Sequence, residues 1–426
     1  MSNQKLLNRN FTMVVVGQII SLLGNAILSF ALPLHLLRLT GSAAVFGTVM
    51  AISVIPSVLL SPIGGILADR INRRNIMVAL DYITCGIILL SGVFIGSYTV
   101  ATISVVLLLL SVIRSFYQPA VNACIPSITA DANLLRANSV VNTVSGVSML
   151  IGPILGGILY GFWGITPIIW ISAGAFFLSA VMEMFIRLPF TRQPLTQGIL
   201  GTVKQDFSES FHFISKKKPV IGTTIIIAAF INMVISSLLT IGEPYIINIT
   251  LGLSSELYGI AQSLLGIGSL AGGVLVGVLA GKLTTRYYHW LQIGLSISIL
   301  PMGLTLMGGV PVMTSFWVVA VSCFFVMVFA GMMSIAAITL IQQLTPSESI
   351  GKVIALTLAF CNCATPMGQA IYGFLFEAMP ARPYLIIFGA GVISLVVALA
   401  SRRVWQQVSE QQPEGPLPGR CAPTSD

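Results

Sequence analysis

The stretch Gly65-Ile66-Leu67-Ala68-Asp69-Arg70-Ile71-Asn72-Arg73-Arg74 is a short basic turn between two long apolar runs. A further charge, Arg114, lies in the middle of the apolar run 99–124. Helices can cross a hydrocarbon layer because they satisfy their own backbone hydrogen bonds, but a guanidinium inside the layer is costly and usually serves a pathway or a partner. The two features together are typical of a membrane transporter.

The composition excludes a soluble globular protein. Of 426 residues, 56% are hydrophobic and 8% are charged, and the mean hydropathy is +0.95. A soluble domain carries about a quarter charged residues. The chain therefore has to dissolve in lipid, and its net charge of +8 does not indicate nucleic-acid binding.

Twelve apolar runs are long enough to cross a bilayer, which takes about 20 residues as a helix. They begin near Phe11, Val45, Asn75, Thr99, Asn138, Thr166, Val220, Leu257, Tyr288, Val312, Lys352 and Pro383. The sequence therefore predicts an all-α membrane protein with twelve transmembrane helices.

The basic residues predict the orientation in the membrane. With a cytoplasmic N-terminus, only Arg38 and Arg382 of the 21 lysines and arginines fall on the outer side, and Arg114 lies within a span. Positively charged loops stay on the cytoplasmic side. We therefore expect a multi-pass protein of the cell (inner) membrane with both termini in the cytoplasm, whose first helix is retained and is not a signal peptide.

The two halves of the chain resemble each other at a constant offset of 212 positions. The matching segments are Phe46-Gly47 with Tyr258-Gly259, Gly65–Arg74 with Gly277–Arg286, and Tyr160-Gly161-Phe162 with Tyr372-Gly373-Phe374. Three matches at one offset are hard to obtain by chance. Two parallel six-helix repeats that rock about a central site are a transporter design.

A polar stretch separates the repeats and gives the expected domain bounds. These are an N-terminal six-helix bundle (1–188), a cytoplasmic linker (189–219), a C-terminal six-helix bundle (220–404) and a disordered cytoplasmic tail (405–426). Apolar residues in the linker share one helical face, which fits either a helix on the inner membrane surface or a plain tether. The tail is rich in Gln, Pro and Gly.

The stretch Gly65–Arg74 resembles the signature loop of the major facilitator superfamily, Gly-x-Leu-Ala-Asp-Arg-x-Gly-Arg-Arg, which joins the second and third spans on the cytoplasmic side. Asn72 replaces the usual second glycine, and asparagine tolerates a left-handed turn better than most residues. The resemblance implies a major facilitator fold and a conformational gate that latches the two halves together in one state. The gate residues would be Gly65, Asp69, Arg70, Arg73 and Arg74. The alternative is a basic loop that only fixes topology.

A second motif lies in the fifth span. Gly152-Pro153-Ile154-Leu155-Gly156-Gly157 resembles the end of a motif associated with exporters of this superfamily, with Ser148 where a further glycine is common. Small residues let helices approach closely, and proline creates a pliable point. The alternative is a generic kinked packing face.

Four polar residues within apolar runs are candidates for a substrate or proton site: Gln18, Asn25, Arg114 and Glu243. Arg114 resembles the arginine of the superfamily's fourth-span motif, and it serves either proton coupling through a carboxylate or a static bond between helices, for example with Asn25. Glu243 has Ala31 as its counterpart in the first half, so it breaks the internal symmetry. It is either a cavity carboxylate that binds a cation or a proton, or a solvated residue at the rim.

Two further carboxylates lie nearer the cytoplasmic ends of their spans. We expect Asp81 to belong to the network around the basic loop and not to a substrate pocket. Glu183 has Arg187 one turn later, which favours a local helical pair.

The sequence indicates no enzyme, cofactor or metal site. The six cysteines form no ligand or disulfide framework, and the three histidines, His35, His212 and His289, are dispersed near span ends. No Gly-x-x-x-x-Gly-Lys-Ser/Thr phosphate loop occurs, so hydrolysis of ATP by this chain is not expected.

Short matches indicate a branch of the superfamily. Through Gly17-Gln18, 39–43, 68–70 and Pro119-Ala120 the chain looks most like macrolide-efflux and siderophore-export proteins. We therefore expect a secondary active transporter that exports an amphipathic organic compound, such as a drug, by proton antiport and alternating access. The expected partners are a small-molecule substrate, protons and the lipid bilayer, with no nucleic acid and a monomeric chain. The alternatives are an importer, or a siderophore or metabolite exporter, of the same fold, and a non-transporting membrane sensor, which the absence of a recognisable output domain disfavours.

Overall fold

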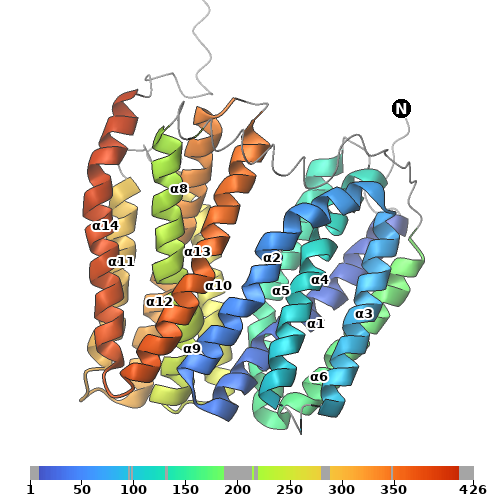
Figure 1. Ribbon diagram of the computed structural model, residues 1–426, viewed down its shortest axis with the longest axis horizontal. Coiled ribbons are helices and arrows are strands. Elements are labelled where there is room, and N and C mark those ends of the chain that lie inside the picture. Colours follow the sequence, from blue (N-terminus) through green and yellow to red (C-terminus); the bar gives the residue numbers. More distant parts are fainter. Residues whose placement is uncertain are drawn as a thin grey trace, which may run out of the picture.

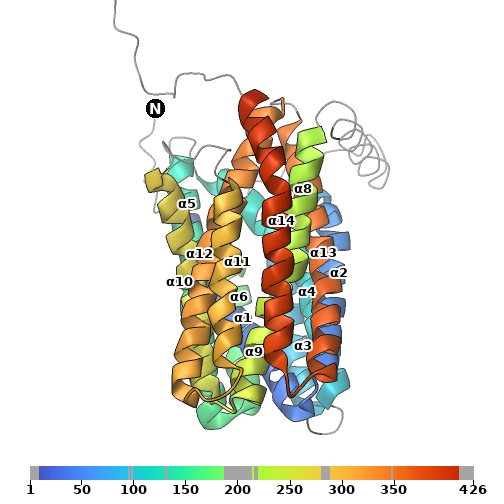
Figure 2. The same cartoon turned by 90° about the vertical axis from the view of Figure 1, so that its left-hand side faces the viewer.

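The computed structural model is a bundle of long helices that run roughly parallel to one another (Figures 1 and 2). It describes residues 9–94, 96, 99–129, 133–186, 214, 219–279, 288–346 and 349–411. These residues contain helices and turns and no strand.

The first half consists of six helices. They are α1 (Arg9–Thr40), α2 (Ala43–Arg70), α3 (Arg73–Phe94), α4 (Thr99–Ile128), α5 (Leu134–Trp163) and α6 (Ile165–Met184). α1 and α4 contact each other, α2 packs on α4, and α5 packs on α1. α3 and α6 pack together and support α4 and α1. One face of this half is thus formed by α2, α4, α1 and α5, with α3 and α6 behind it.

The second half begins with a span that is not a regular helix. It runs through α8 (Pro219–Ile231), then η3 (Asn232–Ser236), η4 (Leu238–Gly242), α9 (Glu243–Tyr245) and η5 (Ile246–Thr250), where the η segments are π-helical. The remaining helices are α10 (Ser255–Leu279), α11 (Tyr288–Thr305), α12 (Val312–Leu344), α13 (Ile350–Ala378) and α14 (Pro383–Gln411). π-Helical turns are frequent at functional sites.

The predicted spans agree closely with these helices. Eleven helical stretches of the described chain are long and apolar enough to cross a bilayer, and α11, with 18 residues, completes the twelve. Every span begins within four residues of its predicted start. Helix α14 continues past the expected boundary at Trp405 to Gln411. The predicted linker, apart from Ile214 and Pro219, and the tail from residue 412 onward lie outside the described residues.

The two ends of the bundle differ. The basic end carries Arg9, Arg70, Arg73 and Arg74, and the opposite end carries the α1–α2 turn and the loop 379–382. We name the opposite end the sealed end because the two halves meet there. Figure 1 shows the halves leaning together at the sealed end, drawn below, and lying further apart at the basic end, drawn above.

Local chemistry sets the α1–α2 turn at the sealed end. Gly41 has φ +60°, a left-handed conformation that glycine adopts without strain, and its N–H bonds to Leu37 O at 2.8 Å. Ser42 then caps α2, because its side chain accepts a hydrogen bond from the backbone N–H of Val45. The chain therefore reverses within two residues and starts α2 at a fixed position against the second half.

Candidate functional site

The first seam between the halves joins α2 to α13. A Cβ atom at Gly47 would lie 2.6 Å from Gln369 O and 2.8 Å from the Cα of Gly373, and a Cβ at Gly373 would lie 2.8 Å from Ala43 O. Only glycine permits backbones to approach this closely. The sealed end is therefore closed along this seam by direct backbone packing.

The second seam joins α5 to α10 and uses the exporter-type motif. A Cβ at Gly157 would lie 2.7 Å from Ser255 O, and one at Gly259 would lie 2.5 Å from Pro153 O. The other two glycines of the motif, Gly152 and Gly156, face Ala26 and Phe30 of α1. The motif thus packs α5 against its own half and against the other half at once.

The two seams use equivalent positions on α2 and α10 but not on α5 and α13. Gly47 and Gly259 correspond at the offset of 212 positions. Their partners Gly373 and Gly157 do not, because Gly157 corresponds to Gln369. The contact on α13 is therefore displaced by four residues, about one helical turn.

Two charged side chains add polar contacts across the sealed end. Arg38 of α1 donates to Asn248 Oδ1 and to Leu253 O, both at 2.9 Å. Glu377 of α13 accepts from Ser42 Oγ at 3.0 Å and from the backbone N–H of Ala44 at 3.3 Å. The carboxylate of Glu377 lies at the N-terminus of α2, where an anion is favoured by the helix dipole.

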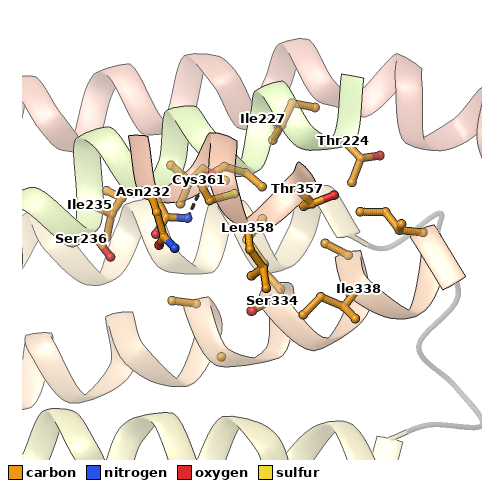
Figure 3. A pocket seen from close by; sticks show the side chains of 18 of the residues that line it. Thr224, Ile227, Asn232, Ile235, Ser236, Ser334, Ile338, Thr357, Leu358 and Cys361 are labelled. Atoms are coloured by element: carbon orange, nitrogen blue, oxygen red, sulfur yellow. Dashed lines mark hydrogen bonds between the residues drawn. The ribbon is translucent and has the colours of Figure 1, made fainter. Parts of the chain in front are cut away.

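A pocket of about 340 Å³ lies within the second half, between the irregular span, α12 and α13 (Figure 3). Its walls are mostly apolar, and none of the lining residues is charged. The polar side chains among them are those of Thr224, Asn232, Ser236, Ser269, Ser334, Thr357 and Asn362, together with Cys361 and Trp405. Thr224 and Trp405 place one end of the pocket near the basic end, and η3 supplies Asn232 and Ser236 to its other side.

Two of the predicted site residues are buried inside the halves, outside this pocket. Gln18 is 2% exposed and donates from Nε2 to the hydroxyl of Tyr117 at 2.9 Å. Glu243 is 0% exposed and accepts from Gln262 Nε2 at 2.7 Å. Glu243 is therefore not a solvated residue at the rim of the molecule. Asn25 is half-buried.

Arg114 is exposed and makes no hydrogen bond or ion pair with a described residue, including Asn25. Around helix α4, the neighbours of Arg114 face two different helices. Tyr117 faces α1, and the carbonyl of Ser115 contacts α2. Phe116 lies on the opposite face of α4, towards α3. Arg114 thus points from the face that α1, α2, α4 and α5 form. Because α2 and α5 are the helices that touch the second half, this face looks towards that half.

The family follows from a whole-chain comparison. The family model of the Major Facilitator Superfamily matches residues 14–368 and 225–420. The chain belongs to this superfamily. It is therefore a multi-pass membrane transporter with the major facilitator fold of two six-helix bundles.

Several exporters of this superfamily are similar to the chain. Macrolide efflux protein A of Streptococcus pyogenes is 24% identical over 398 residues, which cover 91% of this chain and 94% of that protein. The enterobactin exporter EntS of Salmonella paratyphi A is 24% identical over 412 residues, which cover 94% of each chain. A solved structure of a bacterial homologue of the iron transporter ferroportin, in an inward-facing state, is 19% identical over 96% of this chain and 100% of that one, with a TM-score of 0.72.

The major facilitator signature loop makes its described contacts within the first half. Arg73 donates to Ala68 O at 3.1 Å, to Ala123 O at 2.8 Å and to Ser127 Oγ, so it ties the α2–α3 turn to α4. Arg74 donates to Met184 O at the end of α6.

The other gate residues contribute differently. Arg70 Nη1 is buried without a hydrogen-bond partner among the described residues, and a Cβ at Gly65 would meet no atom within 4 Å. The close approach in this segment belongs instead to Gly64, which lies directly against Ser115 O of α4. The side chain of Asp69 lies outside the described part of the chain, so the latch between the halves stays a prediction.

Sequence reasoning did not find the network around Asp81 and Glu183. Tyr117 Oη donates to Glu183 Oε1 at 2.8 Å, and Gln18 donates to the same hydroxyl. The expected partner of Glu183, Arg187, lies outside the described residues. Both carboxylates are polar residues within apolar runs, which is the signal that could have found them, but their nearest basic neighbours in the sequence suggested local pairing instead.

Proposed function

We propose that this chain is a secondary active transporter that exports an amphipathic organic compound, drug-like or macrolide-like, by proton antiport and alternating access. The observation that carries the proposal is the pocket of about 340 Å³, whose walls are mostly apolar with a few amides and hydroxyls and no charge. Such a pocket buries the lipophilic body of a ligand and orients it through a small number of hydrogen bonds. Asn362 makes no hydrogen bond with a described residue, so its amide is available to a ligand.

Alternating access is supported by the difference between the two ends. The halves touch through backbone packing at the sealed end, while at the basic end Arg73 bonds to Ala123 O of α4 and Arg74 to Met184 O of α6, both in the first half. The positive-inside rule assigns the basic end to the cytoplasm of the cell, which puts both termini there. The end of the pocket at Thr224 and Trp405 then lies towards the cytoplasm, the side from which an exporter loads its substrate.

The direction of transport is supported by the relatives. Macrolide efflux protein A and the enterobactin exporter are both named for export, and each matches more than nine tenths of this chain. Fold alone does not set direction. The proposal of export therefore depends on these relatives and on the exporter-type motif in the α5–α10 seam.

Arg114 favours a second candidate, an exporter of an anionic or acceptor-rich metabolite such as a siderophore. Its guanidinium points towards the other half without a partner among the described residues. Guanidinium forks bind carboxylates and other planar acceptors well. An Arg114→Gln variant would lose transport of an anionic compound and keep transport of a neutral one.

The test of the proposed function is transport into and out of cells. We expect cells that express the chain to accumulate less of the dye Hoechst 33342 or of erythromycin, and a proton uncoupler to abolish the difference. In a Cys363→Ser, Cys421→Ser background, Cys361 is the one cysteine not buried, and a transported compound should slow its alkylation by a maleimide.

A Cys361→Ser variant in the same background is the control for labelling. Unchanged accumulation across a broad panel of lipophilic compounds, macrolides and siderophores would contradict export. Alkylation of Cys361 at the same rate with and without a transported compound would contradict the assignment of the pocket.

A further inference from the structure

Two carboxylates that the pocket does not use lie together inside the first half. Glu183, in the last turn of α6, is 0% exposed, and Asp81 of α3 is 2% exposed. The two are close enough to interact electrostatically. Glu183 Oε2 and Asp81 Oδ2 are fully buried and have no hydrogen-bond partner in the part of the chain that the structure describes.

Hydrogen-bond donors hold the other oxygen atoms of this pair. Tyr117 donates to Glu183 Oε1 at 2.8 Å, and the Ser179 hydroxyl, which lies 3.2 Å from Gly17 O, is also within hydrogen-bond range of Asp81. Gln18 in turn holds the Tyr117 hydroxyl at 2.9 Å. Helices α1, α3, α4 and α6 therefore all contribute to one enclosed polar site.

Among the described residues, the charged and titratable groups around the pair do not neutralise it. Helix α4 contributes Tyr117 and Cys124. Arg73, at the start of α3, and Glu183 both interact electrostatically with Cys124. The donors of Arg73 reach Ala68 O, Ala123 O and Ser127 Oγ. Neither carboxylate forms an ion pair with a described residue.

This arrangement requires a bound proton. Two adjacent carboxylates in a low-dielectric interior cannot both stay ionised without a compensating cation, because desolvation and mutual repulsion both oppose the charge. A proton bound to one of the two carboxylates removes one of the two buried charges. Glu183 Oε2 and Asp81 Oδ2 are the two carboxylate oxygens of the described site that lack a hydrogen-bond donor.

We propose that Asp81 and Glu183 together form the site at which the coupling proton of this transporter binds. The inference rests on the proposed proton antiport and names the residues that perform it. Hydronium gives its proton to one carboxylate oxygen and leaves as water, and the reverse step returns the proton to water. Glu183 lies in the last turn of α6, next to Met184, whose carbonyl holds Arg74 of the signature loop.

Release of the proton would act on the signature loop. An ionised pair attracts the guanidinium of Arg73, which is then drawn away from Ala123 O and Ser127 of α4. The α2–α3 turn would move with it, and α2 is the helix whose other end forms a seam with α13. Glu243, the fully buried carboxylate of the other half, is held by Gln262 and makes no described contact with this loop.

The first test is spectroscopic and needs no substrate. The purified full-length protein should show the infrared C=O band of a protonated carboxylic acid at neutral pH. We expect the Asp81→Asn, Glu183→Gln double variant, whose amides mimic the neutral groups, to lose part of that band. Glu348→Gln, a carboxylate in the segment between α12 and α13, is the control and should keep it. An identical band in the wild type and the double variant would overturn the proposal.

The second test separates this inference from the proposed function. In proteoliposomes, a pH gradient should drive wild-type accumulation of erythromycin or Hoechst 33342. The Asp81→Asn and Glu183→Gln variants should lose this drive at least tenfold while still exchanging labelled compound at equilibrium. Absence of pH-driven transport in the wild type would refute the antiport. Retention of the drive in both variants, or its loss in Glu243→Gln alone, would refute the assignment of the site and leave the antiport standing.

Discussion

Single side chains at the sealed end have roles that their sequence position did not indicate. The sequence predicts Arg38 only as one of two basic residues on the outer side. In the structure it bridges α1 to Asn248 and Leu253 of the other half. Arg382, the other outer arginine, makes no side-chain bond with a described residue. Two residues with the same predicted location therefore differ in what they stabilise.

An Arg38→Ala variant should open the sealed end more often. Hydrogen bonds made by a charged group contribute about 1.5–3 kcal/mol, so their loss should shift the equilibrium at least tenfold towards the state open at this end. Spin labels at Trp163 and Met379, exposed at the sealed end in opposite halves, would report longer distances. Arg382→Ala is the matched control, and equal distance distributions in the two variants would contradict a role for Arg38.

The side chains of the site were the least predictable part of the molecule. Hydropathy reports how deep a residue lies along a span but not which face of the helix it occupies. Gln18 and Glu243 were correctly singled out as polar residues in apolar runs, but both turn into the interior of a half. Glu183 accepts a hydrogen bond from Tyr117, 66 positions away, and no local sequence pattern predicts such a pair.

At the scale of helices, prediction succeeded where the signal is local or repeated. Spans follow from runs of apolar residues, and the glycines that revealed the internal repeat, Gly47, Gly259 and Gly373, are those that form the seams. The π-helical course of the seventh span was not predicted, because hydropathy reports the length of an apolar run and not which helical hydrogen-bond pattern the run adopts. Its packing depends on α13, where Gly368 lies against the carbonyl of Met233.

A Gly373→Leu variant should prevent closure of the sealed end. Its Cβ would lie 2.8 Å from Ala43 O and 3.1 Å from the Cα of Gly47, and backbone atoms cannot yield as a side chain can. Overpacking of this kind costs about 1–3 kcal/mol, which is paid only in the closed seam. The distance between labels at Trp163 and Met379 should lengthen, while Gly389→Leu in α14, where a Cβ meets no atom within 4 Å, should leave it unchanged. Unaltered distances in Gly373→Leu would show that the seam can close without a glycine there.

At the scale of the whole molecule, the structure represents one side of a cycle. The sealed end is closed by two seams, whereas the bonds of Arg73 and Arg74 in the signature loop run to α4 and α6 of the first half. Arg70 keeps a buried N–H without a partner in this state. The predicted latch would form when the basic end closes.

An Asp69→Asn variant should slow turnover and leave substrate binding largely intact. If the latch stabilises the closed basic end by about 1.4 kcal/mol, turnover falls roughly tenfold. Initial rates of erythromycin efflux and equilibrium binding of the same compound would separate the two effects, with Asp131→Asn, a carboxylate of the α4–α5 segment, as the control. A normal efflux rate in Asp69→Asn would remove the latch.

Because the contact on α13 is displaced by one helical turn, the contacts that close the sealed end differ between its two sides. On the α2–α13 side, the carboxylate of Glu377 in α13 is hydrogen-bonded to the start of α2. On the α5–α10 side, the carboxylate of Glu256 in α10 lies over Gly161 and makes no hydrogen bond with a described residue. The α5–α10 side is held instead by the Ser263 hydroxyl, which donates to Leu150 O at 2.8 Å, and by Arg38, which bonds to Leu253 O just before α10. We therefore expect the sealed end to open by breaking different bonds on its two sides, those of a carboxylate, Glu377, on one and those of a guanidinium, Arg38, on the other.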